Sequence, residues 1–144
     1  MNAKDIINGT WGELWIDGDK VSECIALQAK VTINKAPVSF CGDLFTHNKV
    51  IGLEGKGSLK LHKASSRMII KISANMKAGK QTVCTIVSKL ADPDSMGAER
   101  VAIYEVSFDE LTIADWENKK NGEEDVPFTF ANWEFLDTIA PQNI

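Results

Sequence analysis

The stretch from Val50 to His62 limits the possible folds of this chain more than any other. From residue 53 onward its side chains alternate between two rows. One row holds Leu53, Gly55, Gly57, Leu59 and Leu61, and the other holds Glu54, Lys56, Ser58, Lys60 and His62. Strict period-two alternation predicts a strand with one buried face and one wet face. Fully extended, such a strand spans about 43 Å, whereas a domain of this length has a radius of gyration of about 14–15 Å. We therefore expect it to cross the whole body or to project beyond it.

Glycines are concentrated in and just before this strand, at Gly42, Gly52, Gly55 and Gly57. Glycine weakens an isolated strand and marks a bend or a close approach of another backbone. A phosphate cradle is a weaker interpretation, because these glycines lie inside an alternating strand and not between a strand and a helix. A long, glycine-rich strand with a charged face suits a surface that a neighbouring subunit completes.

The rest of the chain predicts short strands and one helix. Asp17-Gly18 is typical of a hairpin turn, and apolar residues at helical spacing predict a helix that Ser65 or Ser66 caps and Gly79 ends. The predicted strands are 11–16, 23–33, 37–41, 50–62, 81–90, 100–108, 111–116 and 126–135. The expected fold is mainly β: packed antiparallel sheets, as a sandwich or barrel, with one flanking helix at about 65–78 and an extended hairpin at about 37–62. We expect a single domain over 1–144, with 1–10 and 136–144 as flexible arms.

Composition narrows the function classes. A net charge of -4 and a pI near 5.2 argue against a dedicated nucleic-acid binder. The three cysteines, Cys24, Cys41 and Cys84, lack metal or redox spacing and indicate buried thiols in a reducing compartment. No signal peptide and no apolar run of membrane-spanning length is apparent, so we expect neither conventional export nor stable membrane anchoring.

The sequence gives little evidence for a metal site or a catalytic site. The only histidines are His47 and His62, and a metal site would need partners such as Asp43, Glu54 or Cys41 without any recognised ligand spacing. Surface or interface histidines are the better interpretation. We expect no metal, no cofactor and no catalytic residue.

Two further sets of residues can be interpreted either as ordinary structural residues or as functional ones. Acid–base pairs are conceivable among the carboxylates Glu105, Asp109, Glu110 and Asp115, but carboxylates on wet strand faces are common. Tryptophans near strand ends most often pack in the core or at a sheet edge, but tryptophan is also enriched at subunit contacts, and both interpretations stay open. They are Trp11, Trp15, Trp116 and Trp133.

Four blocks in a fixed order carry a resemblance to a known family. They are the segments 12–18 (GELWIDG), 47–63 (HNKVIGLEGKGSLKLHK), 99–109 (ERVAIYEVSFD) and 124–130 (EDVPFTF). Together they make the chain resemble the tail-tube proteins of contractile phages and of phage-tail-like bacteriocin particles; the type VI secretion tube protein is similar in design. The resemblance implies packed antiparallel sheets with one helix. It also implies six subunits per ring, a continuous inner β-barrel, and rings stacked into a tube that sheath contraction drives through an envelope.

The resemblance implies partners and locations as well. The partners are other copies of the chain, a sheath protein, baseplate or initiator and tape-measure proteins, and DNA in transit in a true phage. The protein would lie in the cytoplasm of the producing bacterium during assembly, and afterwards in a virion or released particle.

Three groups of residues take roles from this resemblance. The inter-ring loop would be Asp43, Leu44, Phe45, Thr46, His47, Asn48 and Lys49, with the two terminal arms as further ring contacts. The intersubunit strand would include Gly52, Gly55, Gly57 and Leu59. The channel lining would be Glu54, Lys56, Ser58, Lys60 and His62.

The lysines of this lining are a difficulty for a channel that passes DNA, because basic groups hold phosphates. Either other strands supply carboxylates, or the lysines pair with neighbours, or the lining is the polar face of 23–33 or of 81–90. Two rival functions also stay open: a monomeric soluble β-sandwich binding module, and a small β-rich hydrolase using Glu105 and Asp109. The first predicts a stable monomer with a ligand groove, and the second a deep pocket with shifted carboxyl pKa values.

Overall fold

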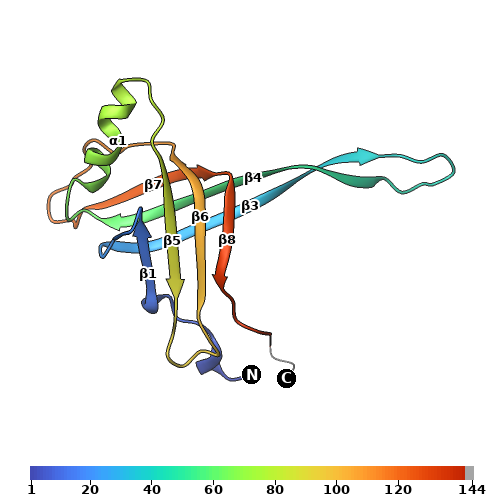
Figure 1. Cartoon of the computed structure of the whole chain (residues 1–144), viewed down its shortest axis with the longest axis horizontal. Coiled ribbons are helices and arrows are strands. Elements are labelled where there is room, and N and C mark those ends of the chain that lie inside the picture. The colour runs from blue at the N-terminus through green and yellow to red at the C-terminus, as the bar shows by residue number, and fades with distance from the viewer. Residues whose placement is uncertain (142–144) are drawn as a thin grey trace.

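A long hairpin dominates the computed structural model, which describes residues 1–141 (Figure 1). Strand β3 (Cys24–Val38) pairs along its length with strand β4 (His47–His62). Strand β7 (Glu123–Phe130) covers the other edge of β4 only from Gly55 to His62. Beyond that point the two strands run on alone as an arm, residues 32–54, that leaves the body. The predicted projecting hairpin is confirmed, and it begins earlier than expected because 23–33 and 37–38 form one strand.

The remaining strands form the second half of the sheet. They are β1 (Gly12–Ile16), β2 (Asp19–Lys20), β5 (Val83–Leu90), β6 (Glu99–Phe108) and β8 (Asn132–Asp137). All pairs are antiparallel, and the strand order is β2-β1-β5-β6-β7-β4-β3. Strand β8 pairs with β6 on the edge that faces away from β5. β6 and β7 share only the pairs Ser107↔Thr129 and Phe108↔Phe128. At this narrow join the sheet folds, so that β3, β4 and β7 lie across β1, β5, β6 and β8 (Figure 1).

The core fills the space between these two layers. β4 and β7 contribute the buried side chains Leu59, Leu61, Val126, Phe128 and Phe130. The other layer contributes Leu14, Ile16, Cys84, Ile86, Ile103 and Val106. The mainly β, layered antiparallel fold with one helix is as the sequence predicts.

Helix α1 (Arg67–Lys77) closes one end of the core with Met68 and Ile72, and Gly79 ends it at a φ of +72°. The predicted cap is wrong, because the side chain of Ser66 at the N-cap position makes no capping hydrogen bond. Two short 3₁₀ turns, η1 (Ala3–Asp5) and η2 (Gly9–Trp11), precede β1. The Asn8 N–H donates to Asp92 Oδ2 at 2.9 Å, which ties the end of the predicted N-terminal arm to the loop between β5 and β6.

Three predicted strand boundaries are wrong, each for a topological reason. No strand breaks at Pro37, because β3 is the edge strand and a missing N–H on its outer side removes no ladder bond. The predicted strand 111–116 is irregular backbone, and its Ile113 and Trp116 face solvent. The predicted strand 126–135 divides at Ala131, where the chain passes from β7 in one layer to β8 in the other. The predicted arm 136–144 begins inside β8, and residues 142–144 lie outside the described part.

Two bulges change which side chains face the core. Between Cys24 and Ala26 the register shifts, so Cys24 and Leu27 both pack on the core while Ile25 points outward. In β6 the residue Glu105 has a φ of +54°, and the register with β5 skips there. Such an inserted residue flips every side chain that follows it to the other face. The predicted strand 100–108 therefore does not keep one alternation, because its side chains change face at Glu105.

Candidate assembly surfaces

The predicted channel-lining side chains lie together on one face of the β3–β4–β7 layer. Leu59 and Leu61 point into the core, so the intervening residues of β4 point out. In register beside them stand Gln28 with Ser58, Lys30 with Lys56, and Thr32 with Glu54. We call this outward side the polar face. Its β4 members are Glu54, Lys56, Ser58, Lys60 and His62.

The charges of the polar face balance. Its lysines are Lys30, Lys56 and Lys60, and its carboxylates are Glu54, Glu123 and Asp125. Asp125 stands directly across from Lys60, and Lys60 Nζ lies 3.3 Å from Glu123 Oε2. β7 therefore supplies carboxylates beside these lysines, and Lys60 pairs with one of them; which face lines a channel stays a prediction.

The glycines of β4 make room for the phenylalanines of β7. A Cβ at Gly55 would lie 2.7 Å from the Phe130 ring, and one at Gly57 would lie 2.5 Å from Phe128 Cζ. Leu59 is 1% exposed inside the chain's own core. Three of the four predicted intersubunit positions are therefore already packed within the chain. Only Gly52 lies where no strand of residues 1–141 pairs with the second edge of β4, so the part of β4 left for that prediction is 47–54.

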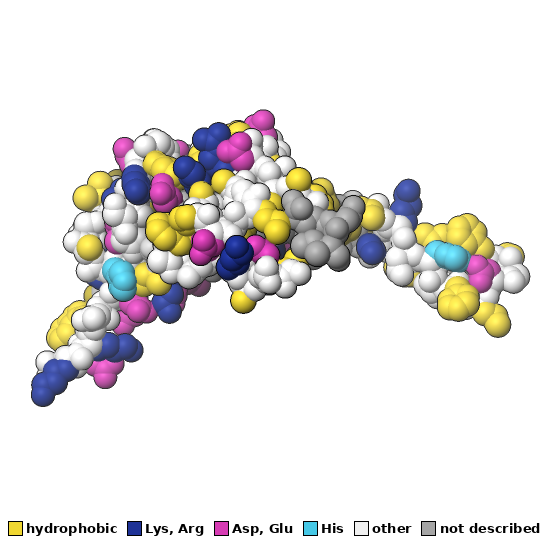
Figure 2. Space-filling model, turned by 90° about the horizontal axis from the view of Figure 1, so that it is seen from below, with side chains coloured by type: hydrophobic (Ala, Val, Ile, Leu, Met, Phe, Trp, Pro, Cys, Tyr) yellow, Lys and Arg dark blue, Asp and Glu magenta, His cyan; other side chains and the backbone are white. Residues whose placement is uncertain are grey.

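The end of the arm carries exposed apolar side chains on a turn that two hydrogen bonds close. We call residues 39–46 the tip; Phe40, Leu44 and Phe45 are exposed there, and Figure 2 shows hydrophobic side chains gathered around a histidine and an acidic residue at this end. Asp43 accepts a hydrogen bond from the Phe45 N–H at 2.9 Å and lies 2.6 Å from His47 Nε2. The bond from His47 holds the pKa of Asp43 below its usual value. The Phe40 ring stands edge-on to the imidazole at 5.3 Å between centroids.

The predicted inter-ring residues divide between two elements. Asp43, Leu44, Phe45 and Thr46 belong to the tip, and His47, Asn48 and Lys49 begin β4. Sequence reasoning missed the apolar side chains along the arm. Ile33, Val50, Ile51 and Leu53 are all exposed. Ile33 and Leu53 stand across from one another and continue the core-facing rows of β3 and β4. The signal was present in the alternation, which does not stop where the body ends.

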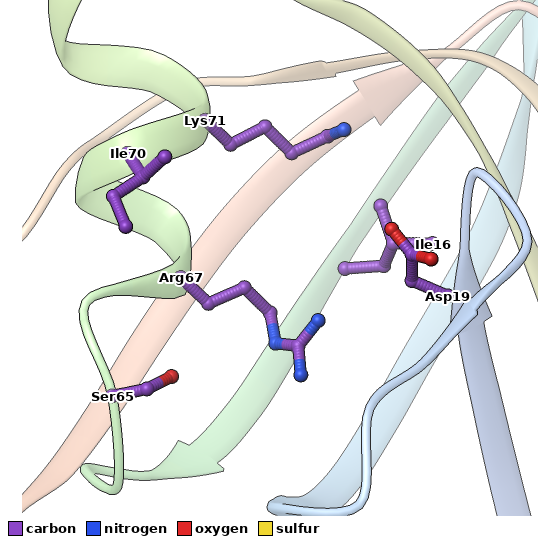
Figure 3. Close-up of a pocket in the computed structure, with 6 residues that line it drawn as sticks. All are labelled: Ile16, Asp19, Ser65, Arg67, Ile70 and Lys71. Carbon is purple, nitrogen blue, oxygen red and sulfur yellow. The ribbon is translucent and has the colours of Figure 1, made fainter.

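A hollow of about 450 Å³ lies beside α1, and two of its three charged side chains, Arg67 and Lys71, form ion pairs that hold the fold (Figure 3). Arg67 Nε donates to Glu23 Oε1 at 2.7 Å, and Lys71 Nζ donates to Asp17 Oδ2 at 2.7 Å. The bond from Arg67 lowers the pKa of Glu23. Burial alone would raise the pKa of Asp17, but bonds from Lys71 and the Thr85 N–H outweigh it and lower the pKa.

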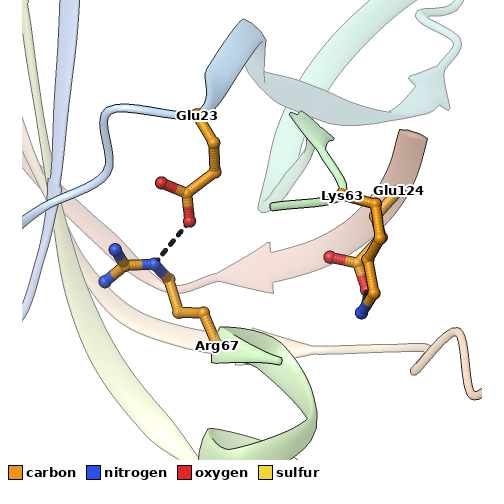
Figure 4. A network of polar contacts seen from close by, with 4 residues as sticks. All are labelled: Glu23, Lys63, Arg67 and Glu124. Carbon is orange, nitrogen blue, oxygen red and sulfur yellow. Dashed lines mark hydrogen bonds and ion pairs between the residues drawn. The ribbon is translucent and has the colours of Figure 1, made fainter. Parts of the chain in front are cut away.

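Nearby, the buried Glu124 pairs with Lys63 at 3.0 Å (Figure 4). Glu105 and Asp109, the carboxylates of the hydrolase interpretation, are exposed and do not line this hollow. Within residues 1–141 no cluster of histidine, cysteine and carboxylate side chains suits a metal ion, and no helix is long and apolar enough to cross a membrane.

A comparison with known proteins decides the family. Residues 1–137 match the family described as Phage tail tube protein. The chain belongs to the phage tail tube protein family. The tail tube protein is 32% identical over 142 residues to the phage-like element PBSX protein XkdM of Bacillus subtilis (strain 168), with 97% of each chain covered. It is also 32% identical over 136 residues to the uncharacterised protein YqbM of the same strain, over 93% of this chain and 92% of that one.

Solved structures share its fold at low sequence identity. A chain from the sheath–tube complex of an extracellular contractile injection system superposes with a TM-score of 0.75 at 6% identity, over 94% of this chain and 95% of that one. A chain from the tube-terminating cap of an anti-feeding prophage gives 0.73 at 9% identity, over 97% and 95%. The tail tube protein is thus a structural component of a phage tail or tail-like particle and not an enzyme.

Proposed function

We propose that this protein is the subunit of the inner tube of a contractile phage tail or phage-tail-like particle. Six copies form a ring, rings stack into a hollow tube, and contraction of the surrounding sheath drives the tube through the target envelope. Assembly takes place in the cytoplasm of the producing bacterium. The partners are further copies of the chain, the sheath, the baseplate and the tape-measure protein, with DNA in transit only in a true phage.

The arm is the observation that carries this proposal. A two-stranded ribbon is marginally stable alone in water, yet here it extends past β7 with Ile33, Val50 and Leu53 uncovered. Exposed apolar side chains in such a row mark a contact surface. The outer edge of β3 is also unpaired within the described chain, and an unpaired edge is a template for another strand. Pairing with a neighbour in a closed ring consumes these edges.

The polar face suits the lining of the channel. With its lysines matched by carboxylates, it presents no net positive surface to hold a phosphate chain in transit. The tip and the residues 47–49 suit the contact between rings, because they lie farthest from the body (Figure 1). In this arrangement Gly52 and the unpaired edge of 47–54 face the next subunit.

Electron microscopy in negative stain tests the proposal, on the purified protein alone and after co-expression with its sheath protein. Rings or tubes with a central hole are the expected result in the co-expressed sample. The matched pair of variants is Leu44→Ser and Ile70→Ser, since both residues are exposed and only the first lies at the tip. Of these two variants, only Leu44→Ser should fail to form tubes, and Ile70→Ser should form them as the wild type does. A monomer under both conditions, without sheath association, would instead establish the monomeric binding module.

A further inference from the structure

Two Asn-Gly pairs occur in the sequence, Asn8-Gly9 and Asn121-Gly122. Asparagine is a chemically labile residue, and before glycine it can react with its own backbone, because the glycine nitrogen can attack the side-chain amide carbon. Glycine favours this attack because it has no Cβ to hinder it and adopts more backbone conformations than other residues. The attack succeeds only where the nitrogen can approach the side chain, so the fold decides which pair reacts.

The first pair is held in a conformation that does not allow this attack. Asn8 is the N-cap residue of η2, and its Oδ1 accepts hydrogen bonds from the Thr10 N–H at 3.0 Å and from the Thr10 hydroxyl at 2.9 Å. Its own N–H donates to Asp92. With a ψ of 126° at Asn8, the Gly9 nitrogen points away from the Asn8 side chain. Reaction at this pair therefore requires the cap to open first.

The second pair lies in the irregular segment between β6 and β7. Asn121 is exposed and follows a turn in which the Lys120 N–H donates to the Glu117 carbonyl oxygen at 3.3 Å. Gly122 is held through its own carbonyl oxygen, which accepts from the Lys63 N–H at 2.9 Å. Within residues 1–141 neither the Asn121 side chain nor the Gly122 N–H is engaged in a hydrogen bond. The two groups that react are therefore free to meet.

We propose that Asn121 is a site of spontaneous deamidation, a modification that does not depend on the proposed tube function. The Gly122 nitrogen forms a bond with Asn121 Cγ, and the amide nitrogen leaves as ammonia with the proton of the Gly122 N–H. The product is a succinimide ring that joins the two residues. Water then adds to either ring carbonyl and opens the ring. One opening gives aspartate at position 121, and the other gives isoaspartate, in which the main chain runs through the former side-chain carbon.

The modification acts on the join between β4 and β7. Glu124 lies just beyond the pair, and its carboxylate is 3.0 Å from Lys63 Nζ (Figure 4). A new carboxylate at position 121 adds negative charge beside this ion pair. Isoaspartate also lengthens the main chain just before Gly122, whose carbonyl bonds the Lys63 N–H. Little room is left for this change, because even a Cβ on Gly122 would lie 2.8 Å from Lys63 Cβ. We expect the beginning of β7 to separate from β4 in the isoaspartate product.

Peptide mapping of the purified protein, kept folded in mildly alkaline buffer and sampled over time, tests this inference. Mass spectrometry follows the conversion of amide to carboxyl at each pair, and an isoaspartate assay identifies the rearranged product. The Asn121 peptide should become modified, and the Asn8 peptide should react about five-fold more slowly or less. This factor corresponds to an N-cap contribution of about 1 kcal/mol. In protein kept unfolded in urea the two pairs should react at similar rates, because only the fold distinguishes them.

The variant Asn121→Gln should abolish the modification and keep the urea midpoint, because residue 121 is exposed and glutamine would have to close a larger ring. Asn118→Gln is the matched control, since Asn118 is exposed in the same segment and is not followed by glycine; reaction at Asn121 should continue in it unchanged. Equal rates at the two pairs in the folded protein, or an unmodified Asn121 in folded protein whose unfolded form reacts, would overturn the inference. Neither result bears on the tube function, which electron microscopy tests separately.

Discussion

The close packing of Gly57 predicts a large effect from the smallest possible side chain. A Cβ at this position would lie 2.3 Å from the Gln28 backbone oxygen and 2.5 Å from Phe128 Cζ, about 1 Å short of ordinary contact distances of 3.4–4 Å. Phe128 is 1% exposed, and the oxygen belongs to the neighbouring strand, so neither can withdraw freely. Gly57→Ala should therefore lower the free energy of unfolding, because overpacking a core costs about 1–3 kcal/mol. Alanine also restricts the unfolded chain more than glycine does, which offsets about 0.4–1 kcal/mol of this loss in stability.

The net loss should be about 1–2 kcal/mol, which corresponds to a decrease in Tm of about 3–10 °C for a domain of this size. Gly52→Ala is the matched control, because its Cβ meets nothing nearer than Asn34 Nδ2 at 4.0 Å. Without a clash, this variant should be neutral or stabilised by about 0.4–1 kcal/mol. Urea unfolding of the unassembled protein, followed by tryptophan fluorescence, compares the two. Equal midpoints for the two variants would refute the assignment of Gly57 to a tight strand–core contact.

Three further predictions follow from the exposed tip, the thiols and the ion pairs. The double variant Leu44→Ser, Phe45→Ser should keep the urea midpoint of the unassembled protein, because both side chains are exposed, and should lose tube formation in negative stain. Cys41 should react with a thiol reagent at once, and Cys84 only on unfolding, because burial raises the pKa of Cys84 to about 11; equal rates for both would contradict this burial. Glu23 has a lowered pKa in the folded state, so its stabilising effect is complete above its ordinary value, about 4.3, and is lost as pH falls through the lowered value. In a series of Tm measurements from pH 6 to 2, Glu23→Gln should lose less Tm than the wild type.

The sequence predicts the hairpin well because one rule governs it. Alternation from Leu53 to His62 places Leu59 and Leu61 in the core and the charged residues outside, as the structure has them. The glycines add a second signal, since Gly57 stands where Phe128 needs room. The tip was recognisable as a loop with two apolar side chains. The contacts of Asp43 with Phe45 and His47 were not, because they depend on the backbone path of the turn.

The failures occur where strand pairing, and not local pattern, decides the structure. Nothing in the residues around Glu105 marks the bulge, which arises because β6 must pair with β5 and then turn toward β7. The segment 111–116 was expected to be a strand, yet it pairs with no strand of residues 1–141.

The exposure of a single row of side chains connects the fold with its assembly. Along the core-facing row of β4, Leu61 and Leu59 are 1% exposed, whereas Leu53 is 57% exposed. All three side chains are leucines; the difference is that the layer of β1, β5, β6 and β8, which covers Leu59 and Leu61, does not extend to Leu53. Burying a leucine fully is worth about 1.5–3 kcal/mol, so Leu53 and the facing Ile33 hold a stabilisation that the isolated chain does not realise. A second copy that covers this part of the arm realises it, which ties the stability of the arm to assembly. The variant Leu53→Lys should therefore leave the urea midpoint of the unassembled protein unchanged and shift its assembly equilibrium toward the monomer, as measured by sedimentation. An unchanged equilibrium would place the intersubunit contact elsewhere.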